Sequence, residues 1–184
     1  SIHFDEAIGK RVLIVGDVGT GKTASTMRLL TEAVDKGYSR DVTVLEMAPE
    51  ARILRGLSVG GWLKLKKDWN IRVIKSGDIK TPRLSAKDAE ELIEMADHNR
   101  HEIDKLLDKF TAEPTGILFV NDISLYLLRG DLERLWGTVK KADTLVANGY
   151  LGERLREDFG TGVSARERAL MEGLASRMDV VIHL

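Results

Sequence analysis

The chain has 184 residues, of which 31% are charged and 43% are hydrophobic, and its formal net charge is −1. This length and composition predict one globular domain over residues 1–184, and the balanced charge gives no strong signal for nucleic-acid binding. No signal peptide or apolar run of membrane-spanning length is visible, so we expect no membrane association and a cytoplasmic location.

The first predicted strand is the β-branched run 11–15, and the first long helix covers residues 22–36. Between them stands Gly16-Asp-Val-Gly-Thr-Gly-Lys22-Thr23, which fits the phosphate-binding Walker A pattern G-x-x-x-x-G-K-T. Glycines allow close backbone approach to a ligand, and the free N–H groups of a helix start attract anions. We expect Lys22 to neutralise phosphate charge as a catalytic residue and Thr23 to ligate Mg²⁺. The expected ATP-binding residues are Gly16, Asp17, Val18, Gly19, Thr20, Gly21, Lys22, Thr23 and Ala24.

A second strand is predicted at residues 41–46, and a helix at residues 50–56 follows Pro49. Glu46 ends that strand. A carboxylate at the tip of a strand beside the glycine-rich loop could orient an attacking water as a general base. The alternative is a solvated acid at the end of a strand or at the start of a helix.

A short strand at residues 71–74 leads into a polar connection that carries Lys75, Lys80 and Arg83. These cations could receive a small anionic acceptor, or they could simply be solvated.

A long amphipathic helix is predicted at residues 86–110, and residues 85–88 resemble its capping box. His98 and His101 lie off its apolar stripe. We expect both to be solvated, because the sequence shows no carboxylate–histidine arrangement that converges on them.

The apolar run 117–120 is typical of a strand covered on both faces, and Asn121-Asp122 follows it. Four apolar residues and then an acid form a Walker B pattern, in which the strand delivers a carboxylate to Mg²⁺. We therefore predict Asp122 as the second metal ligand. Alternatively, Asp122 caps the next helix.

The rest of the chain predicts a helix at 130–141, a strand at 144–147, a Gly- and Arg-rich loop at 151–168, a helix at 169–178 and a strand at 180–182. The loop could act as a lid that brings an arginine to a phosphate, or it could be a charged surface segment. Strands alternate with helices, which predicts an α/β fold: a three-layer, doubly wound, mostly parallel sheet. Ligands of such sheets bind at the carboxyl ends of the strands.

These motifs resemble P-loop NTPases of the RecA-like ATPase division, on Gly16 to Thr23, Val44-Leu-Glu46 and Leu118 to Asp122. The resemblance implies the P-loop NTPase fold, with Glu46 matching the catalytic base of circadian-clock-type members. Residues 116–183 are also similar in arrangement to corrinoid adenosyltransferases, although Asn121-Asp122-Ile123 replaces their Asp-Glu.

The sequence leaves three functions open: Mg²⁺-dependent ATP hydrolysis, transfer from ATP by a small-molecule kinase or an adenosyl or nucleotidyl transferase, and a nucleotide-dependent switch with little turnover. The chain has no Gln, which excludes the water-orienting Gln of Ras-type GTPases. The guanine-specific Asn-Lys-x-Asp is absent at Asn148, which favours ATP. Absence of Cys and Gln with many charges is typical of thermophilic proteins, and a homo-oligomer is left open.

Overall fold

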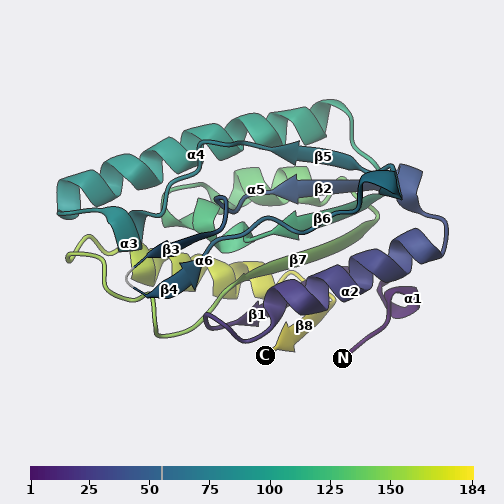
Figure 1. The fold of residues 1–184 in the computed structure, drawn as a ribbon, viewed down its shortest axis with the longest axis horizontal. Helices are drawn as coiled ribbons and strands as arrows, with labels where there is room; N and C mark the ends of the chain where they lie inside the picture. Colours follow the sequence, from purple (N-terminus) through teal and green to yellow (C-terminus); the bar gives the residue numbers. More distant parts are fainter. Residues whose placement is uncertain (55) are drawn as a thin grey trace.

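A six-stranded sheet forms the centre of the computed structural model, which describes residues 1–54 and 56–184 (Figure 1). Its strands pair in parallel throughout, in the order β5-β2-β6-β7-β1-β8. They are β1 (Arg11–Gly16), β2 (Val42–Glu46), β5 (Arg72–Lys75), β6 (Ile117–Asn121), β7 (Thr144–Tyr150) and β8 (Val180–His183). β7 lies between β1 and β6, so the ends of the two strands that carry the predicted motifs are one strand apart.

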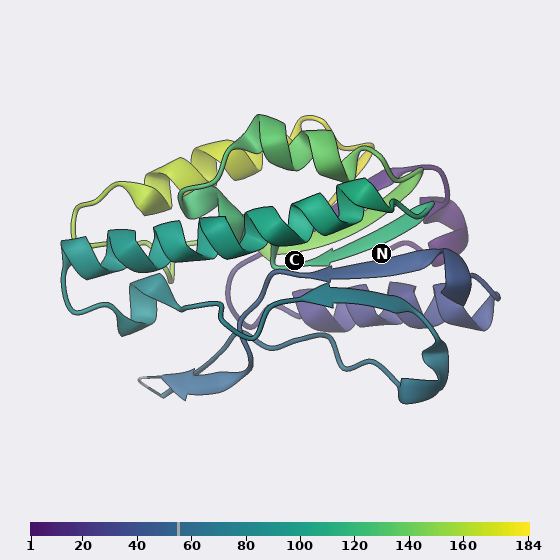
Figure 2. The same ribbon diagram turned by 90° about the horizontal axis from the view of Figure 1, so that it is seen from above.

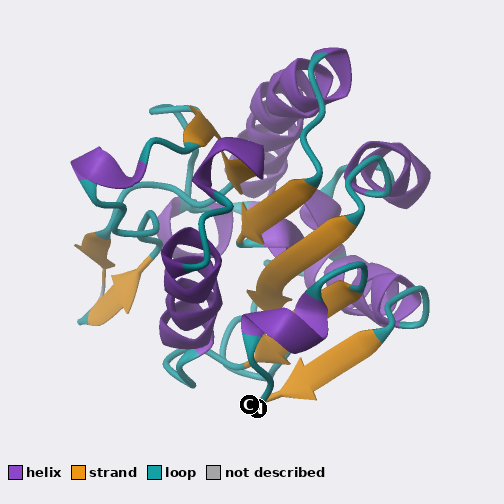
Figure 3. Ribbon diagram, turned by 90° about the vertical axis from the view of Figure 1, so that its right-hand side faces the viewer, coloured by secondary structure: helices purple, strands orange, loops and turns teal. Residues whose placement is uncertain are grey.

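Helices cover both faces of this sheet (Figures 2 and 3). On one face lie α1 (Phe4–Ala7) and α2 (Lys22–Asp35). On the other lie α4 (Ala89–Ala112), α5 (Leu132–Val139) and α6 (Val163–Ala175). The predicted α/β class is confirmed, and the arrangement is compatible with three layers. No helix among the described residues combines the length and the apolarity that a bilayer crossing requires.

The two faces of the sheet bury separate apolar clusters. On the α2 side, Leu29 and Leu30 pack with Ile14 of β1, and the Phe4 ring stacks on Phe119 with ring centroids 6.2 Å apart. On the α4 side, one large cluster joins α4, α5 and α6 to the sheet. β1, β2, β6 and β7 are buried almost throughout, which explains why their sequences read as continuous apolar runs.

The helix predicted at residues 50–56 is wrong. The chain instead forms a two-stranded antiparallel hairpin of β3 (Arg52–Leu54) and β4 (Leu57–Val59). A helix of seven residues is marginal without a packed apolar face, and Gly56 at φ +76° supplies the turn of a hairpin instead. Arg55 lies outside the described residues.

Three helix starts also differ from the prediction. α5 begins at Leu132 rather than at residue 130, with Asp131 as its N-cap. α4 begins at Ala89, because Asp88 is its N-cap and accepts the backbone N–H of Glu91 at 2.8 Å. Ser85 ends a separate short helix, α3 (Pro82–Ser85). α6 begins six residues earlier than the prediction, within the segment assigned to a loop. Among the described residues, 3-10 helices occupy Ser39–Asp41, Lys67–Trp69 and Ile123–Leu128.

Candidate functional site

The glycine-rich loop between β1 and α2 presents unpaired backbone donors. Gly19 and Gly21 have φ of +75° and +94°, conformations that only glycine adopts without strain. Gly21 is the N-cap of α2 and provides no side-chain cap. Within the described part of the chain, the backbone N–H groups of Lys22, Thr23 and Ala24 therefore have no acceptor. Such a helix start favours an anionic ligand.

The Lys22 side chain folds back over this loop, and its Nζ donates to the Asp17 carbonyl oxygen at 2.6 Å. Desolvation lowers the pKa of Lys22, and the nearby carboxylates of Asp122 and Asp17 oppose that shift. Asp17 in turn accepts the backbone N–H groups of Val18 at 2.7 Å and Glu153 at 2.9 Å. The glycine-rich loop is thus tied to the segment that follows β7.

Asp122 stands at the carboxyl end of β6 in the left-handed conformation, with φ +59°. Its backbone N–H donates to Asn148 Oδ1 at 2.7 Å, and its carboxylate accepts the Ser124 hydroxyl at 3.2 Å. Burial raises the pKa of Asp122, while Ser124 and the charges of Lys22 and Arg83 oppose the rise. The side chain makes no capping bond to the 3-10 helix that follows, so the capping alternative is wrong.

A cavity of about 210 Å³ joins the glycine-rich loop to Asp122. Its lining comes from the loop and α2, the β3–β4 hairpin and its flanks, the segment 80–84, and the ends of β6 and β7. The lining residues are Val18, Gly19, Lys22, Thr23, Ala48, Pro49, Ser58, Gly60, Gly61, Lys80, Thr81, Pro82, Arg83, Leu84, Asn121, Asp122, Ser124, Leu125, Asn148, Tyr150, Leu155 and Glu167. The structure thus brings Lys22, Thr23 and Asp122 together, as the sequence predicts, but Glu46 and Lys75 are not among these residues.

Two of these lining residues, Asn121 and Asn148, belong to a chain of buried side-chain hydrogen bonds. Asn121 Nδ2 donates to Glu46 Oε1 at 2.7 Å. Asn148 Nδ2 donates to Asn121 Oδ1 at 2.9 Å and to Thr26 Oγ1 at 2.8 Å. Thr26 donates to the Lys22 carbonyl oxygen at 2.8 Å. These bonds hold the ends of β2, β6 and β7 against α2 and fix Asp122 opposite the glycine-rich loop.

Sequence reasoning missed Asn121, Asn148 and Thr26 as positioning residues. Asn121 and Asn148 carried a signal, because each is a polar residue at the carboxyl end of a buried apolar strand. A buried amide needs partners for both its donor and its acceptor, and neighbouring strand ends can supply them. Thr26 carried no signal beyond its place on the buried side of α2.

Glu46 is enclosed by donors. It is 2% exposed, its Oε1 accepts the backbone N–H of Ala48 at 3.1 Å as well as Asn121, and its Oε2 accepts the backbone N–H of Leu63 at 2.9 Å. Even so, desolvation raises the pKa of Glu46 to about 7. The described geometry is that of a brace for the segment 47–63, and the water-orienting role stays a prediction.

This pKa predicts a pH-dependent stability. A carboxyl group whose pKa is raised on folding stabilises the fold fully below its unfolded pKa, and that contribution is lost as pH rises through the folded pKa. In the wild type, Glu46 should lower the unfolding free energy by up to about 3 kcal/mol between pH 5 and pH 8, which corresponds to its pKa shift from 4.5 to about 7. Glu46→Gln should lack this part of the fall. Urea unfolding at several pH values measures it. The exposed Glu50→Gln variant should keep the wild-type profile, and a Glu46→Gln profile parallel to the wild type would contradict the prediction.

The cations Lys75, Lys80 and Arg83 do not form one group. Lys75 lies over the Trp62 ring at 4.1 Å, away from the cavity, and Lys80 pairs with exposed Asp78 at 3.0 Å. Arg83 makes a bidentate ion pair with Glu167 at 2.9 and 3.0 Å, in which the two side chains are 7% and 3% exposed. Lys80 and Arg83 reach the main cavity.

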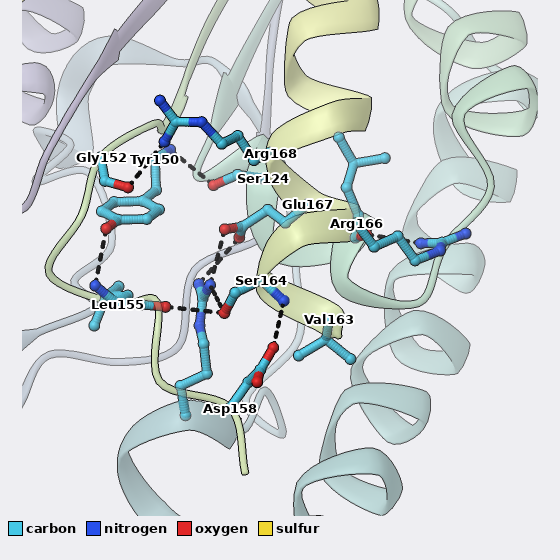
Figure 4. Close-up of polar contacts among 12 residues, drawn as sticks. Ser124, Tyr150, Gly152, Leu155, Asp158, Val163, Ser164, Arg166, Glu167 and Arg168 are labelled. Atoms are coloured by element: carbon cyan, nitrogen blue, oxygen red, sulfur yellow. Dashed lines mark hydrogen bonds and ion pairs between the residues drawn. The ribbon is translucent and has the colours of Figure 1, made fainter. Parts of the chain in front are cut away.

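The segment after β7 is held by several contacts (Figure 4). The Tyr150 hydroxyl accepts the backbone N–H of Leu155 at 2.8 Å, and Ser164 Oγ donates to the Leu155 carbonyl oxygen at 3.0 Å. Asp158 accepts the backbone N–H of Ser164 at 3.0 Å, which explains the early start of α6. The Tyr150 ring packs near the Arg83 guanidinium, at 5.5 Å.

The expectation that no carboxylate converges on His98 is wrong. Asp78 and Glu102 both lie beside it, and their ligand atoms are within 4.8 Å of one another and of the imidazole. His101, in contrast, is exposed.

No protein-family model matches this chain, and no curated protein sequence matches it either.

Proposed function

We propose that this chain is a P-loop NTPase that binds Mg·ATP at the glycine-rich loop and hydrolyses it. The proposal rests on one observation above all. Lys22 and Thr23, whose backbone N–H groups have no acceptor among the described residues, line one cavity together with Asp122 at the carboxyl ends of β1 and β6. A nucleoside triphosphate is an anion that, with Mg²⁺, can engage each of these groups.

Each group has a distinct role in the proposed mechanism. The backbone N–H groups of residues 19–24 cradle the phosphates. Lys22 exchanges its contact with the Asp17 carbonyl for phosphate oxygens and neutralises charge that develops in the transition state. Thr23 and Asp122 supply the oxygen ligands that suit Mg²⁺. When bound, this ion withdraws negative charge from the phosphate oxygens.

Glu46 enters this proposal in one of two ways. As the base that orients water, its carboxylate would have to leave Ala48, Leu63 and Asn121. As a positioning residue, it keeps its present contacts and acts through Asn121. Turnover of Glu46→Gln separates the two, because only the first predicts loss of hydrolysis with ATP affinity retained.

A metal-dependent loss of affinity is expected for Asp122→Asn. Asn has the same size and tolerates the left-handed backbone, so the β6 end should keep its shape. In the presence of Mg²⁺ we expect ATP to bind about tenfold more weakly or worse, because one charged metal ligand is lost. Calorimetric titration with and without Mg²⁺ measures this.

Two controls accompany that titration. Asp88→Asn makes the same chemical change at the N-cap of α4, where Asn caps equally well, and it should bind ATP as the wild type does. In EDTA, Asp122→Asn and the wild type should differ little. Equal affinity of both proteins in Mg²⁺ would remove Asp122 from the metal site.

Transfer to an acceptor is the second candidate, because the cavity extends from Lys22 to Lys80 and Arg83. ATP consumption that requires an added anionic acceptor would favour transfer over hydrolysis. Turnover with ATP and water alone would favour hydrolysis.

A further inference from the structure

A second cluster of ligating side chains lies outside the candidate nucleotide cavity. His98 and Glu102 are one helical turn apart on α4, and Asp78 approaches them from the segment between β5 and α3. His98 Nε2 is 3.0 Å from Asp78 Oδ2 and 2.8 Å from the Asp78 carbonyl oxygen. One imidazole nitrogen and two carboxylate oxygens thus converge from two elements.

The segment that carries Asp78 is fixed on α4. Asn99 is fully buried, and it accepts the backbone N–H of Lys80 at 2.7 Å and donates to the Lys80 carbonyl oxygen at 3.0 Å. Ile79 is 3% exposed. Two anchored residues therefore directly follow Asp78, and its own backbone N–H donates to Ser76 Oγ at 3.1 Å. The fold thus already meets part of the ordering cost of bringing Asp78 to His98.

Outer contacts orient both carboxylates, and one ligand oxygen of each lies within 4.8 Å of an imidazole nitrogen of His98. Lys80 bonds the other Asp78 oxygen, Oδ1, at 3.0 Å, and Lys105 bonds Glu102 Oε1 at 2.9 Å. The Ser76 hydroxyl donates to Glu102 Oε2 at 3.2 Å. Hydrogen bonds from Lys80 and Lys105 lower the pKa of Asp78 and Glu102, so both groups are ionised at neutral pH.

We propose that Asp78, His98 and Glu102 bind a divalent transition-metal cation, with Zn²⁺ the preferred ion, and that this metal fastens the segment 76–80 to α4. The mixed nitrogen and oxygen set suits Zn²⁺, whereas Mg²⁺ and Ca²⁺ prefer oxygen alone. The side chains of Asp78 and His98 are 56% and 33% exposed, so water can complete the coordination. The ion at His98 Nε2 replaces the hydrogen bond to Asp78, and the neutral imidazole then carries its one proton on Nδ1.

The chain offers a matched control for this site. His101 lies on the same helix, three residues from His98, and is exposed. In titrations of the full chain with ZnCl₂ against a chromogenic chelator, we expect one bound equivalent in the wild type and in His101→Ala. His98→Ala should bind at least about tenfold more weakly, since even outer-shell losses cost that much.

A second variant and a second readout guard against a folding defect. Glu102→Gln keeps an acceptor for Ser76 but removes a charged ligand, and it should also lose at least about tenfold in affinity. Zn²⁺ should raise the melting temperature of the wild type and of His101→Ala, but not that of His98→Ala. Mg²⁺ at the same concentration should leave the wild type unchanged.

Three results would overturn this assignment. His98→Ala could bind Zn²⁺ as tightly as the wild type, His101→Ala could lose as much Zn²⁺ affinity as His98→Ala, or the wild type could bind no stoichiometric Zn²⁺. None of these outcomes bears on ATP binding, because Lys22, Thr23 and Asp122 take no part in the cluster.

Discussion

Lys22→Ala should weaken ATP binding by about 2–3 kcal/mol, roughly 30- to 150-fold, and reduce hydrolysis to background. The substitution removes the charge-assisted hydrogen bonds that the Lys22 ammonium would donate to phosphate oxygens. In the described structure this ammonium is half-buried and held on the Asp17 carbonyl, next to the Asp122 carboxylate. The charge is thus already positioned over the cavity before any ligand binds.

Calorimetric titration with Mg·ATP measures binding, and an assay of phosphate release measures hydrolysis. Lys87→Ala is the matched control, since Lys87 is exposed in the connection between α3 and α4 and forms no ion pair among the described residues. Urea unfolding of both variants should show a change of less than about 1 kcal/mol, which is typical of side chains outside the core. Undiminished ATP binding and turnover in Lys22→Ala would refute the proposed function.

Arg83→Met should lower the unfolding free energy by about 3–5 kcal/mol, because it leaves the Glu167 carboxylate buried without its partner. Burial already raises the pKa of Glu167 to about 7 with Arg83 present. Without the guanidinium the carboxyl group should titrate at still higher pH. The destabilisation should therefore be larger at pH 8 than at pH 5.5, where protonation removes the unpaired charge.

Urea unfolding tests this with two controls. Arg129→Met breaks an exposed pair with Asp97, in which the side chains are 41% and 43% exposed, and should cost less than about 1 kcal/mol. The double variant Arg83→Met/Glu167→Met removes both charges and should recover most of the loss. If Arg83→Met lowered the unfolding free energy no more than Arg129→Met does, the buried Arg83–Glu167 pair would contribute no more to stability than an exposed pair.

The sequence predicts the sheet well and its connections less well. Runs such as 11–15 and 117–120 are buried on both faces, so apolarity alone marks them. The prediction for segment 50–56 fails because the chain turns at Gly56 and is closed into a hairpin by bonds between its flanks, from Leu63 to Glu46 and from Gly61 to Pro49. The sequence does not predict the start of α6, because Arg166, Glu167 and Arg168 make this stretch look like a charged loop and because Asp158 stabilises the start from outside the helix.

The candidate site shows the same contrast between residues in local sequence patterns and contacts between distant residues. Lys22, Thr23 and Asp122, which line one cavity in the structure, could be proposed from the sequence because each belongs to a local pattern. The cluster of Asp78, His98 and Glu102 could not be found, because it needs the register between α4 and the segment after β5. The burial of Glu46 and the pairing of Arg83 with Glu167 depend on contacts between residues far apart in the chain, which no local pattern encodes.

The buried amides of Asn121 and Asn148, at the wall of the cavity, have a consequence for folding. Their links join residues 75, 27 and 122 positions apart in the chain, from Glu46 through Asn121 and Asn148 to Thr26. Contacts between residues so far apart in the sequence form late in folding, after the strands that carry them have paired. The cavity lining is therefore held in place only when β2, β6 and β7 have paired. A ligand that binds only this folded cavity would stabilise the whole sheet against unfolding.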